Sequence, residues 1–233
     1  MRERDVRYAA FLDELEKIAL TSRDVPSETP ITTSTDELLK NLQPGDIIAT
    51  KFTHPPLFSN TKRTEWFQRL KGAPKDLAKW THLGLYVGDG KIRHIYPPFK
   101  GRGLEAGFRG RNVLRDQSVK RLENIGREFL VMRPQASEET KQEAVRRSAE
   151  LKGETEFNVT DMLRAGFWAK AGEKGEAKKL TKEDMQRAIC TAVPAYAYPT
   201  FDFGHGKSIK TLMPSDVLAH RRLTPVIAYS DEG

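Results

Sequence analysis

The sequence predicts an α+β fold in which a small antiparallel sheet or half-barrel packs against helices. Three observations support this fold class. Residues 80–96 have the alternation and central turn of a β-hairpin, and residues 3–20 and 137–151 show helical spacing of apolar side chains. The chain has 233 residues, of which 38% are hydrophobic and 30% charged, a composition typical of a globular protein with one principal core.

The predicted hairpin carries a histidine on each arm, His82 and His94, with Gly-Asp-Gly at positions 88–90 between the arms. Glycine supplies the positive φ angles of a tight turn. Because side chains alternate between the faces of a strand, the two histidines share a face only if an odd number of residues forms the loop. A three-residue turn with a bulge meets this condition. One imidazole can then orient the other through a hydrogen bond.

The beginning of the chain predicts a separate segment. Residues 3–20 form an amphipathic helix in this interpretation, and residues 21–36, rich in Ser, Thr and Pro, form an exposed linker. The expected organisation is an N-terminal helix and linker over residues 1–34 and a main domain over residues 35–233. The apolar face of the helix docks either on this domain or on a protein partner, and the sequence does not choose between them.

The main domain begins with a short capped helix at Thr35 and a Pro-Gly turn at residues 43–46, which leads into a strand at 47–50. The patterns further predict a helix at 64–70, a strand at 129–132 and helices at 137–151 and 159–170. Loops are expected at 53–56, 99–110 and 171–179. A short helix capped by Ser215 and a strand at 225–229 are expected to complete the domain.

The only cysteine, Cys190, lies in an Ala-rich run that reads as a helix. Proline is tolerated only near the start of a helix, so Pro194 places the start close to Cys190. A helix N-terminus favours a thiolate and can bind an oxyanion, and we therefore expect the pKa of Cys190 to lie below that of free cysteine. A single cysteine excludes an intrachain disulfide.

Charge and hydropathy narrow the possible partners. The net charge of +7 favours binding to anionic surfaces such as cell-wall polymers or lipid head groups. The sequence has no basic strand interleaved with aromatic residues, so nucleic-acid binding is not expected. No apolar run approaches the roughly 18 residues of a membrane span. No secretory signal is evident at the N-terminus, so the expected location is cytoplasmic or within a virion, for example a phage particle.

Four motifs together resemble the NlpC/P60 superfamily of papain-like cysteine hydrolases. They are Gln-Pro-Gly-Asp-Ile-Ile at 43–48, Thr-His-Leu-Gly-Leu-Tyr-Val-Gly-Asp-Gly-Lys at 81–91 with His94, Cys-Thr at 190–191, and Pro-Ser-Asp-Val-Leu at 214–218. The cysteine motif follows the histidine motif, whereas it precedes it in standard members. This order is similar to the circularly permuted branch that includes the YiiX-like proteins. The resemblance covers about four-fifths of the chain and implies a permuted papain-like domain.

The resemblance also implies an activity and its catalytic residues. Cys190 corresponds to the nucleophile, His82 to the general base and His94 to the polar residue that orients the base. The implied reaction is hydrolysis of an amide, in a bacterial cell-wall (peptidoglycan) peptide or in an acyl-amide such as a lipid amide, with no cofactor and no metal.

Two other hypotheses remain open from the sequence. Cys190, His82 and His94 are all zinc-ligand types and could form a metal site. The protein could instead be a non-catalytic structural or adaptor protein, such as a component of a phage particle or another assembly, that retains the fold and docks through its N-terminal helix. In that case Cys190 would be a buried side chain without a catalytic role.

Overall fold

The computed structural model describes residues 29–52, 60–70, 72–96, 110–123, 127–151, 154–157, 190–203 and 212–230. The helix expected at residues 3–20 and the helix expected at 159–170 lie outside these ranges. So do the loops expected at 53–56 and 171–179 and most of the loop expected at 99–110. The predictions for these segments therefore stay predictions.

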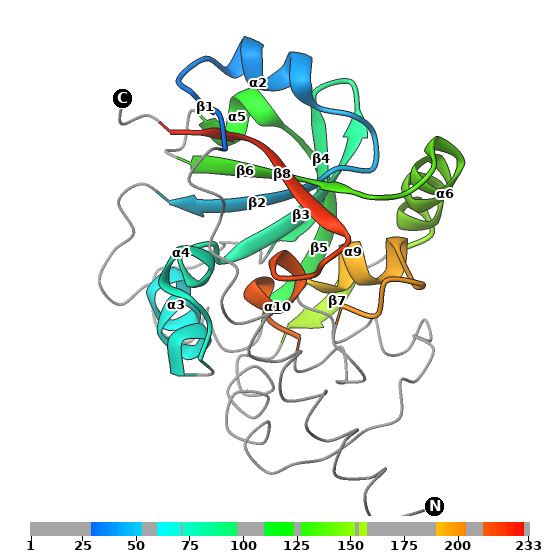
Figure 1. Cartoon of the computed structure of the whole chain (residues 1–233). Helices are drawn as coiled ribbons and strands as arrows, with labels where there is room; N and C mark the ends of the chain where they lie inside the picture. Colours follow the sequence, from blue (N-terminus) through cyan, green and yellow to red (C-terminus); the bar gives the residue numbers. More distant parts are fainter. Residues whose placement is uncertain are drawn as a thin grey trace, which may run out of the picture.

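Eight strands in the described part of the chain form one sheet with the order β1-β8-β6-β2-β3-β4-β5-β7 (Figure 1). All neighbours pair antiparallel except β1 and β8, which pair parallel. The strands span β1 Ile31–Thr32, β2 Ile47–Phe52, β3 His82–Gly88, β4 Lys91–Tyr96, β5 Gly110–Ser118, β6 Arg127–Pro134, β7 Glu154–Phe157 and β8 Leu223–Tyr229.

Seven helices lie among the described residues, and they pack on both faces of the sheet (Figure 1). On one face, α2 and α5 contribute Leu38, Val119 and Leu122 to a core with β-strand residues such as Ile48 and Phe129. On the other face, α4, α6, α9 and α10 contribute side chains to a larger core with Leu83 and Leu85. The helices span α2 Thr35–Asn41, α3 Asn60–Leu70, α4 Lys75–Ala78, α5 Val119–Glu123, α6 Glu138–Ala149, α9 Ala192–Ala197 and α10 Pro214–Leu218. The α+β class and the largely antiparallel sheet are confirmed.

The structure differs from the sequence-based expectation at residues 31–32 and at Ser215, among other places. Residues 31–32 were expected in the exposed linker, but they form β1, because Ile31 and Thr32 pair with Ala228 and Tyr229 of β8. Ser215 was expected to cap α10, but it is a buried residue inside this helix. The helix starts two residues earlier than expected, at Pro214, and the carboxylate of Asp216 accepts a hydrogen bond from the N–H of Met213 at 2.8 Å.

A buried glutamine fixes the chain just before β3. Gln68 of α3 is 0% exposed, and its Nε2 donates to the carbonyl oxygens of Ala78 at 2.8 Å and Trp80 at 3.1 Å. Its Oε1 accepts from the N–H of Ser215 at 2.7 Å. Because buried backbone groups need partners, one side chain thereby ties α3, α4 and α10 to the segment that enters β3.

The Pro-Gly turn before β2 is held by an ion pair. Asp46 is 0% exposed and binds Arg133 of β6 through two hydrogen bonds of 3.0 and 2.9 Å. Its carboxylate also accepts from the N–H of Gln43 at 2.9 Å. Gly45 adopts a φ of 96°, which explains the glycine in this turn. Among the described helices, none is long and apolar enough to cross a membrane.

Candidate active site

The hairpin brings its two histidines to the same face, as predicted. Asp89 and Gly90 form the turn with φ angles of 51° and 67°, and Gly88 pairs with Lys91. The register then shifts between Tyr86 and Gly88, so that Tyr86 pairs with Ile92. The extra residue is therefore a bulge inside the strand rather than a third loop residue, and it sets the parity that the histidines need.

The histidine side chains contact each other directly. Nε2 of His82 lies 2.8 Å from Nδ1 of His94, and the two rings meet edge to face with their planes at 79°. His94 is 1% exposed, whereas His82 is half-buried. Nε2 of His94 lies 3.1 Å from Oε1 of Gln117 on β5. The polar side chains thus form a row, Gln117–His94–His82, that runs from β5 to β3.

Gly84 makes room for this row. It lies between His82 and Tyr86 on β3, and a Cβ atom added there would stand 2.4 Å from Cγ2 of Ile92 and 3.1 Å from Cβ of His94. Both distances are shorter than ordinary van der Waals contact. The absence of a side chain at Gly84 therefore lets β4 bring His94 close to β3.

Cys190 lies beside β3. The ladder between β3 and β4 extends from Gly88 to Leu85, which pairs with Arg93. Beyond that point, the backbone N–H groups of Leu83 and Thr191 lie close enough to the Cys190 thiol to lower its pKa. Leu83 directly follows His82, so the thiol and this imidazole come from neighbouring positions of the fold.

The start of α9 lies close to Cys190, as Pro194 predicted. The helix spans Ala192–Ala197, so Pro194 occupies its third position, where its missing N–H costs no intrahelical bond. Ala192 and Val193 are buried in the same core as Leu83 and Leu85 of β3. Thr191 is also buried, and its hydroxyl donates to the carbonyl oxygen of Leu212 at 3.1 Å. These contacts fix the backbone that carries Cys190.

The expectation of a lowered thiol pKa is wrong. Burial raises the pKa of Cys190 to about 11, and the N–H groups of Leu83 and Thr191 and the charge of Arg127 only partly oppose this effect. Burial also lowers the pKa of His82 well below its usual value, and the charges of His94 and Arg127 add to the decrease. Near neutral pH, the resting pair is therefore a neutral thiol and a neutral imidazole. Desolvation outweighs the helix N-terminus because α9 has only six residues.

A buried arginine adds positive charge to the site. Arg127, at the start of β6, is 4% exposed, and its Nη1 donates to Oγ1 of Thr50 at 2.7 Å. Thr50 pairs with His82 across β2 and β3. Burial and the charge of Arg127 lower the pKa of His94 to about 4, although the hydrogen bond that His94 makes to Gln117 acts in the opposite direction. Both histidines are thus held neutral at physiological pH.

The geometry does not favour the zinc hypothesis. Within the described ranges, no group of three or more His, Cys, Asp or Glu side chains is arranged to hold a metal ion. Both ring nitrogens of His94 already face partners, His82 and Gln117, so this side chain has no nitrogen left for a metal.

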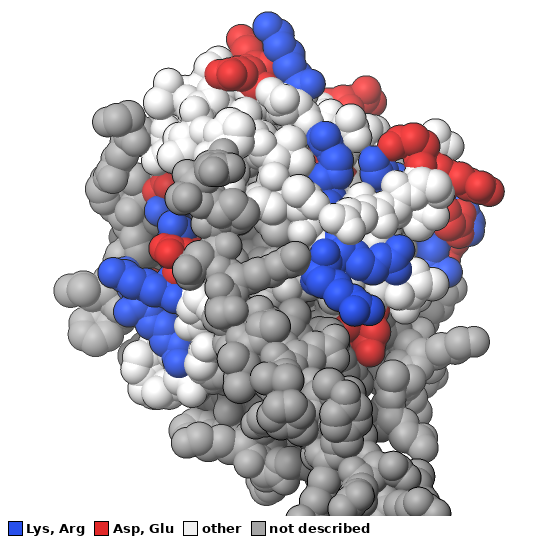
Figure 2. Space-filling model, viewed as in Figure 1, with Lys and Arg blue, Asp and Glu red and all other residues white. Residues whose placement is uncertain are grey.

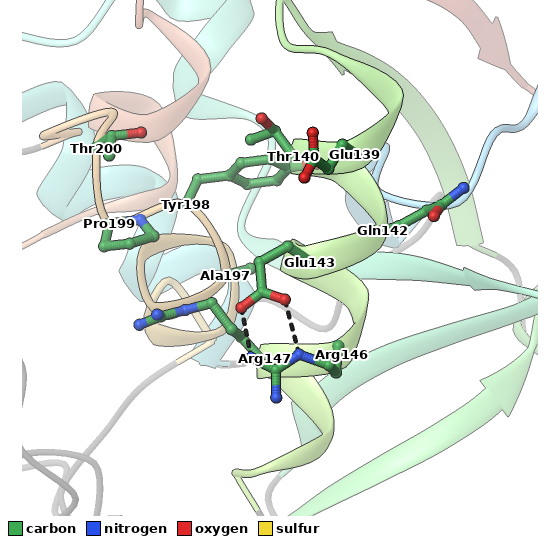
Figure 3. A pocket seen from close by; sticks show the side chains of 10 residues that line it. All are labelled: Glu139, Thr140, Gln142, Glu143, Arg146, Arg147, Ala197, Tyr198, Pro199 and Thr200. Carbon is green, nitrogen blue, oxygen red and sulfur yellow. Dashed lines mark hydrogen bonds and ion pairs between the residues drawn. The ribbon is translucent and has the colours of Figure 1, made fainter.

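A separate groove lies beyond the other end of α9 (Figure 3). It has a volume of about 550 Å³ and runs between α6 and the residues that follow α9. Figure 3 shows Glu143 bound to Arg146 in its wall and Tyr198 pointing toward the start of α6. Cys190, His82 and His94 do not line it. The lining residues are Glu139, Thr140, Gln142, Glu143, Arg146, Arg147, Ala197, Tyr198, Pro199 and Thr200.

On the side of the molecule shown in Figure 2, the charged side chains of the described residues do not form one face of a single sign. Figure 2 shows Lys and Arg in several groups, interspersed with Asp and Glu, on the side of the molecule in view. On α6, Arg146 pairs with both Glu143 and Glu150. On α2 and α5, Asp36 pairs with Lys120. Part of the net positive charge is therefore balanced locally.

Comparisons with known proteins do not assign the chain to a family. No protein-family model matches the chain, and no curated protein sequence matches it. The site therefore has to be interpreted from its own geometry.

Two residues of the site were not found from the sequence. Gln117 lies in β5, whose polar sequence carries no clear strand pattern, and only the pairing of β5 with β4 places it beside His94. Arg127 precedes the predicted strand at 129–132 by two residues and is buried by the longer strand that forms. For Arg127, the only signal in the sequence was its position as a polar residue next to a predicted strand.

Proposed function

We propose that this protein is a cysteine-dependent amide hydrolase, a peptidase or amidase, with Cys190 as nucleophile, His82 as general base and His94 as the residue that orients His82. The observation that carries the proposal is the 2.8 Å contact between His82 and His94, with the backbone N–H of Leu83, the residue after His82, close to the Cys190 thiol. A nucleophile, a base and a group that orients the base are the three parts of a catalytic triad.

The nitrogen positions support this assignment of roles. Nε2 of His82 is engaged by His94, so Nδ1 is the nitrogen that takes the thiol proton. Because the resting thiol is neutral, the proton moves to His82 as sulfur attacks the carbonyl carbon, and the C=O electrons pass to oxygen. The tetrahedral intermediate then collapses and expels the amine, which receives the proton from His82. Water hydrolyses the resulting thioester, with His82 again acting as base.

The buried surroundings suit such a concerted step. Arg127 and the backbone N–H groups around the sulfur stabilise negative charge that develops during attack. Burial, together with the charges of His94 and Arg127, keeps His82 unprotonated at neutral pH, so the base is available without a shift in pH. A site of this kind activates its thiol only when the proton can be transferred to His82.

The permuted papain-like architecture is part of the proposal. The order of elements, with the histidine strands before the cysteine helix, supports it together with the four motifs at 43–48, 81–91, 190–191 and 214–218. On this basis the substrate class is an amide, either a peptidoglycan stem peptide or an acyl-amide. A location inside a phage particle remains a hypothesis from the sequence.

A substrate screen tests the proposal. Full-length protein is incubated with muropeptides and, in parallel, with N-acylated amines, and products are followed by mass spectrometry. We expect cleavage of an amide in one class, absent from Cys190→Ala. Product formation by Cys190→Ala at the wild-type rate would refute the assigned nucleophile, and absence of cleavage of either class by the wild type would leave the structural or adaptor role.

A further inference from the structure

Gln117 extends the polar row beyond the two histidines. It pairs with Ile92 across β4 and β5, which places it on the face that carries His94. Its side chain is half-buried, and its Oε1 lies 3.1 Å from Nε2 of His94. Because His94 is 1% exposed, water does not replace this partner readily, and the ring N–H depends on the protein for its hydrogen bond.

The direction of the first hydrogen bond determines the next. An amide oxygen only accepts, so Nε2 of a neutral His94 carries the proton and its Nδ1 has none. That Nδ1 can then only accept, so Nε2 of His82 must carry the proton in their 2.8 Å contact. Neutral imidazole has one N–H, and Nδ1 of His82 is therefore left unprotonated.

The opposite arrangement would disable the base. If His94 carried its proton on Nδ1, it would donate to Nε2 of His82, and a neutral His82 would hold its proton on Nδ1. That nitrogen could not then accept the proton of a thiol. Both arrangements satisfy the contact between the histidines, so this contact alone does not select one.

We propose that Gln117 is a positioning residue that selects the Nε2–H tautomer of both histidines and thereby keeps Nδ1 of His82 as the basic nitrogen. Its effect on catalysis rests on the proposed hydrolase function, whereas its effect on the tautomers does not. Gln117 acts through two successive hydrogen bonds and does not touch Cys190 in this role.

Nuclear magnetic resonance on full-length protein labelled with ¹⁵N-histidine tests this proposal, because long-range ¹H–¹⁵N spectra distinguish protonated from unprotonated ring nitrogens. The chain has five histidines, and spectra of His82→Ala and His94→Gln assign the two signals. We expect Nε2–H for both rings in the wild type. In Gln117→Leu, which removes the acceptor, we expect a mixture or reversal of tautomers in both rings.

Two variants serve as matched controls. Gln117→Glu keeps an oxygen acceptor and, at alkaline pH where His94 stays neutral beside the added carboxylate, should preserve the wild-type tautomers. Gln135→Leu makes the same change at an exposed glutamine whose side chain binds Thr224, and it should leave both rings unchanged. On a cleaved substrate, Gln117→Leu should lower kcat roughly tenfold or more with KM unchanged, and Gln117→Glu should restore most of it.

The outcomes separate this proposal from the hydrolase function. Unchanged tautomers in folded Gln117→Leu would overturn the role of Gln117 whatever the activity. If Gln117→Leu fails to fold, the wild-type spectrum still tests the role of Gln117. A His82 proton on Nδ1 would overturn this role, and Nε2–H retained on both rings in Gln117→Glu would support it. The expected tautomers in a protein that hydrolyses no amide would contradict the proposed function alone.

Discussion

Two glutamines in this protein have the same side chain and opposite roles. Gln68 is 0% exposed, and its side chain hydrogen-bonds backbone groups at residues 78–80 and at Ser215. Gln117 is half-buried and bonds a single imidazole, which in turn bonds another. Gln68 holds together the segments next to the start of β3, and Gln117 stands at the end of the row that contains the two histidines. Loss of Gln68 should therefore affect stability, and loss of the row should affect chemistry.

The largest expected effect is on catalysis. His82→Ala deletes the base and should lower kcat by about 10³-fold or more, because a neutral thiol is a poor nucleophile without a proton acceptor. His94→Gln should keep measurable activity, since glutamine can still bond His82. Steady-state kinetics on folded variants measures both. Equal losses in the two variants would contradict the separate roles of base and orienting residue.

Gln68→Leu should mainly change stability. It leaves the carbonyl oxygens of Ala78 and Trp80 and the N–H of Ser215 without their buried partner. At about 1–3 kcal/mol for each unsatisfied group, the free energy of unfolding should fall by roughly 3 kcal/mol or more. Denaturant unfolding measures this change, with Gln135→Leu as the exposed control. A loss below about 1 kcal/mol would show that the network does not hold these segments.

The histidine row should make stability depend on pH. The pKa of His94 falls from 6.5 to about 4 on folding, so the unfolded chain binds more protons between these values. Stability is therefore complete above about pH 6.5 and decreases as the pH falls toward 4, by about 3 kcal/mol for His94. His82 shifts in the same direction. The free energy of unfolding of the wild type and of His94→Gln, measured between pH 4 and 6.5, tests this prediction. An equal dependence on pH in the two proteins would contradict the burial of a neutral His94.

A smaller effect is expected at Gly84. In Gly84→Ala the new Cβ would stand 2.4 Å from Cγ2 of Ile92, so β4 has to move away from β3. Overpacking of this kind costs about 1–3 kcal/mol of stability. Because the shift also separates His94 from His82, kcat should fall more than the stability loss explains. Steady-state kinetics at a temperature where the variant is fully folded measures the change in kcat. An unchanged kcat would show that the strands adjust without disturbing the histidines.

The parts of the site that depend on local pattern were predictable from the sequence. The hairpin follows from its glycines and alternating side chains, and the helix start follows from Pro194. The burial of His94 and the end of the β3–β4 ladder at Leu85 were not, because they depend on how the strands pair. Gln117 was missed for the same reason. The thiol pKa was predicted in the wrong direction, because a sequence shows a helix end but not the desolvation around it.

The fold showed the same division. Strands with apolar runs, such as β2, β6 and β8, and the capped helices α2 and α6 were expected close to their observed bounds. Polar β5 and the two-residue β1 were not, because they gain their structure from the pairing of their backbones with β4 and β8. β1 is at one edge of the sheet and β5 is next to the other edge, where fewer side chains are buried and the sequence signal is weaker.

The central claim, that Cys190 is a nucleophile served by His82, can be tested without the natural substrate. Full-length protein is mixed with p-nitrophenyl acetate, and the acyl-enzyme is measured by intact mass and peptide mapping. We predict one hydroxylamine-sensitive acetyl group on Cys190 in the wild type, formed about 10²-fold or more slowly in His82→Ala and absent from Cys190→Ala. Acetylation of Cys190 at the same rate in wild type and His82→Ala, or only after unfolding, would contradict this account.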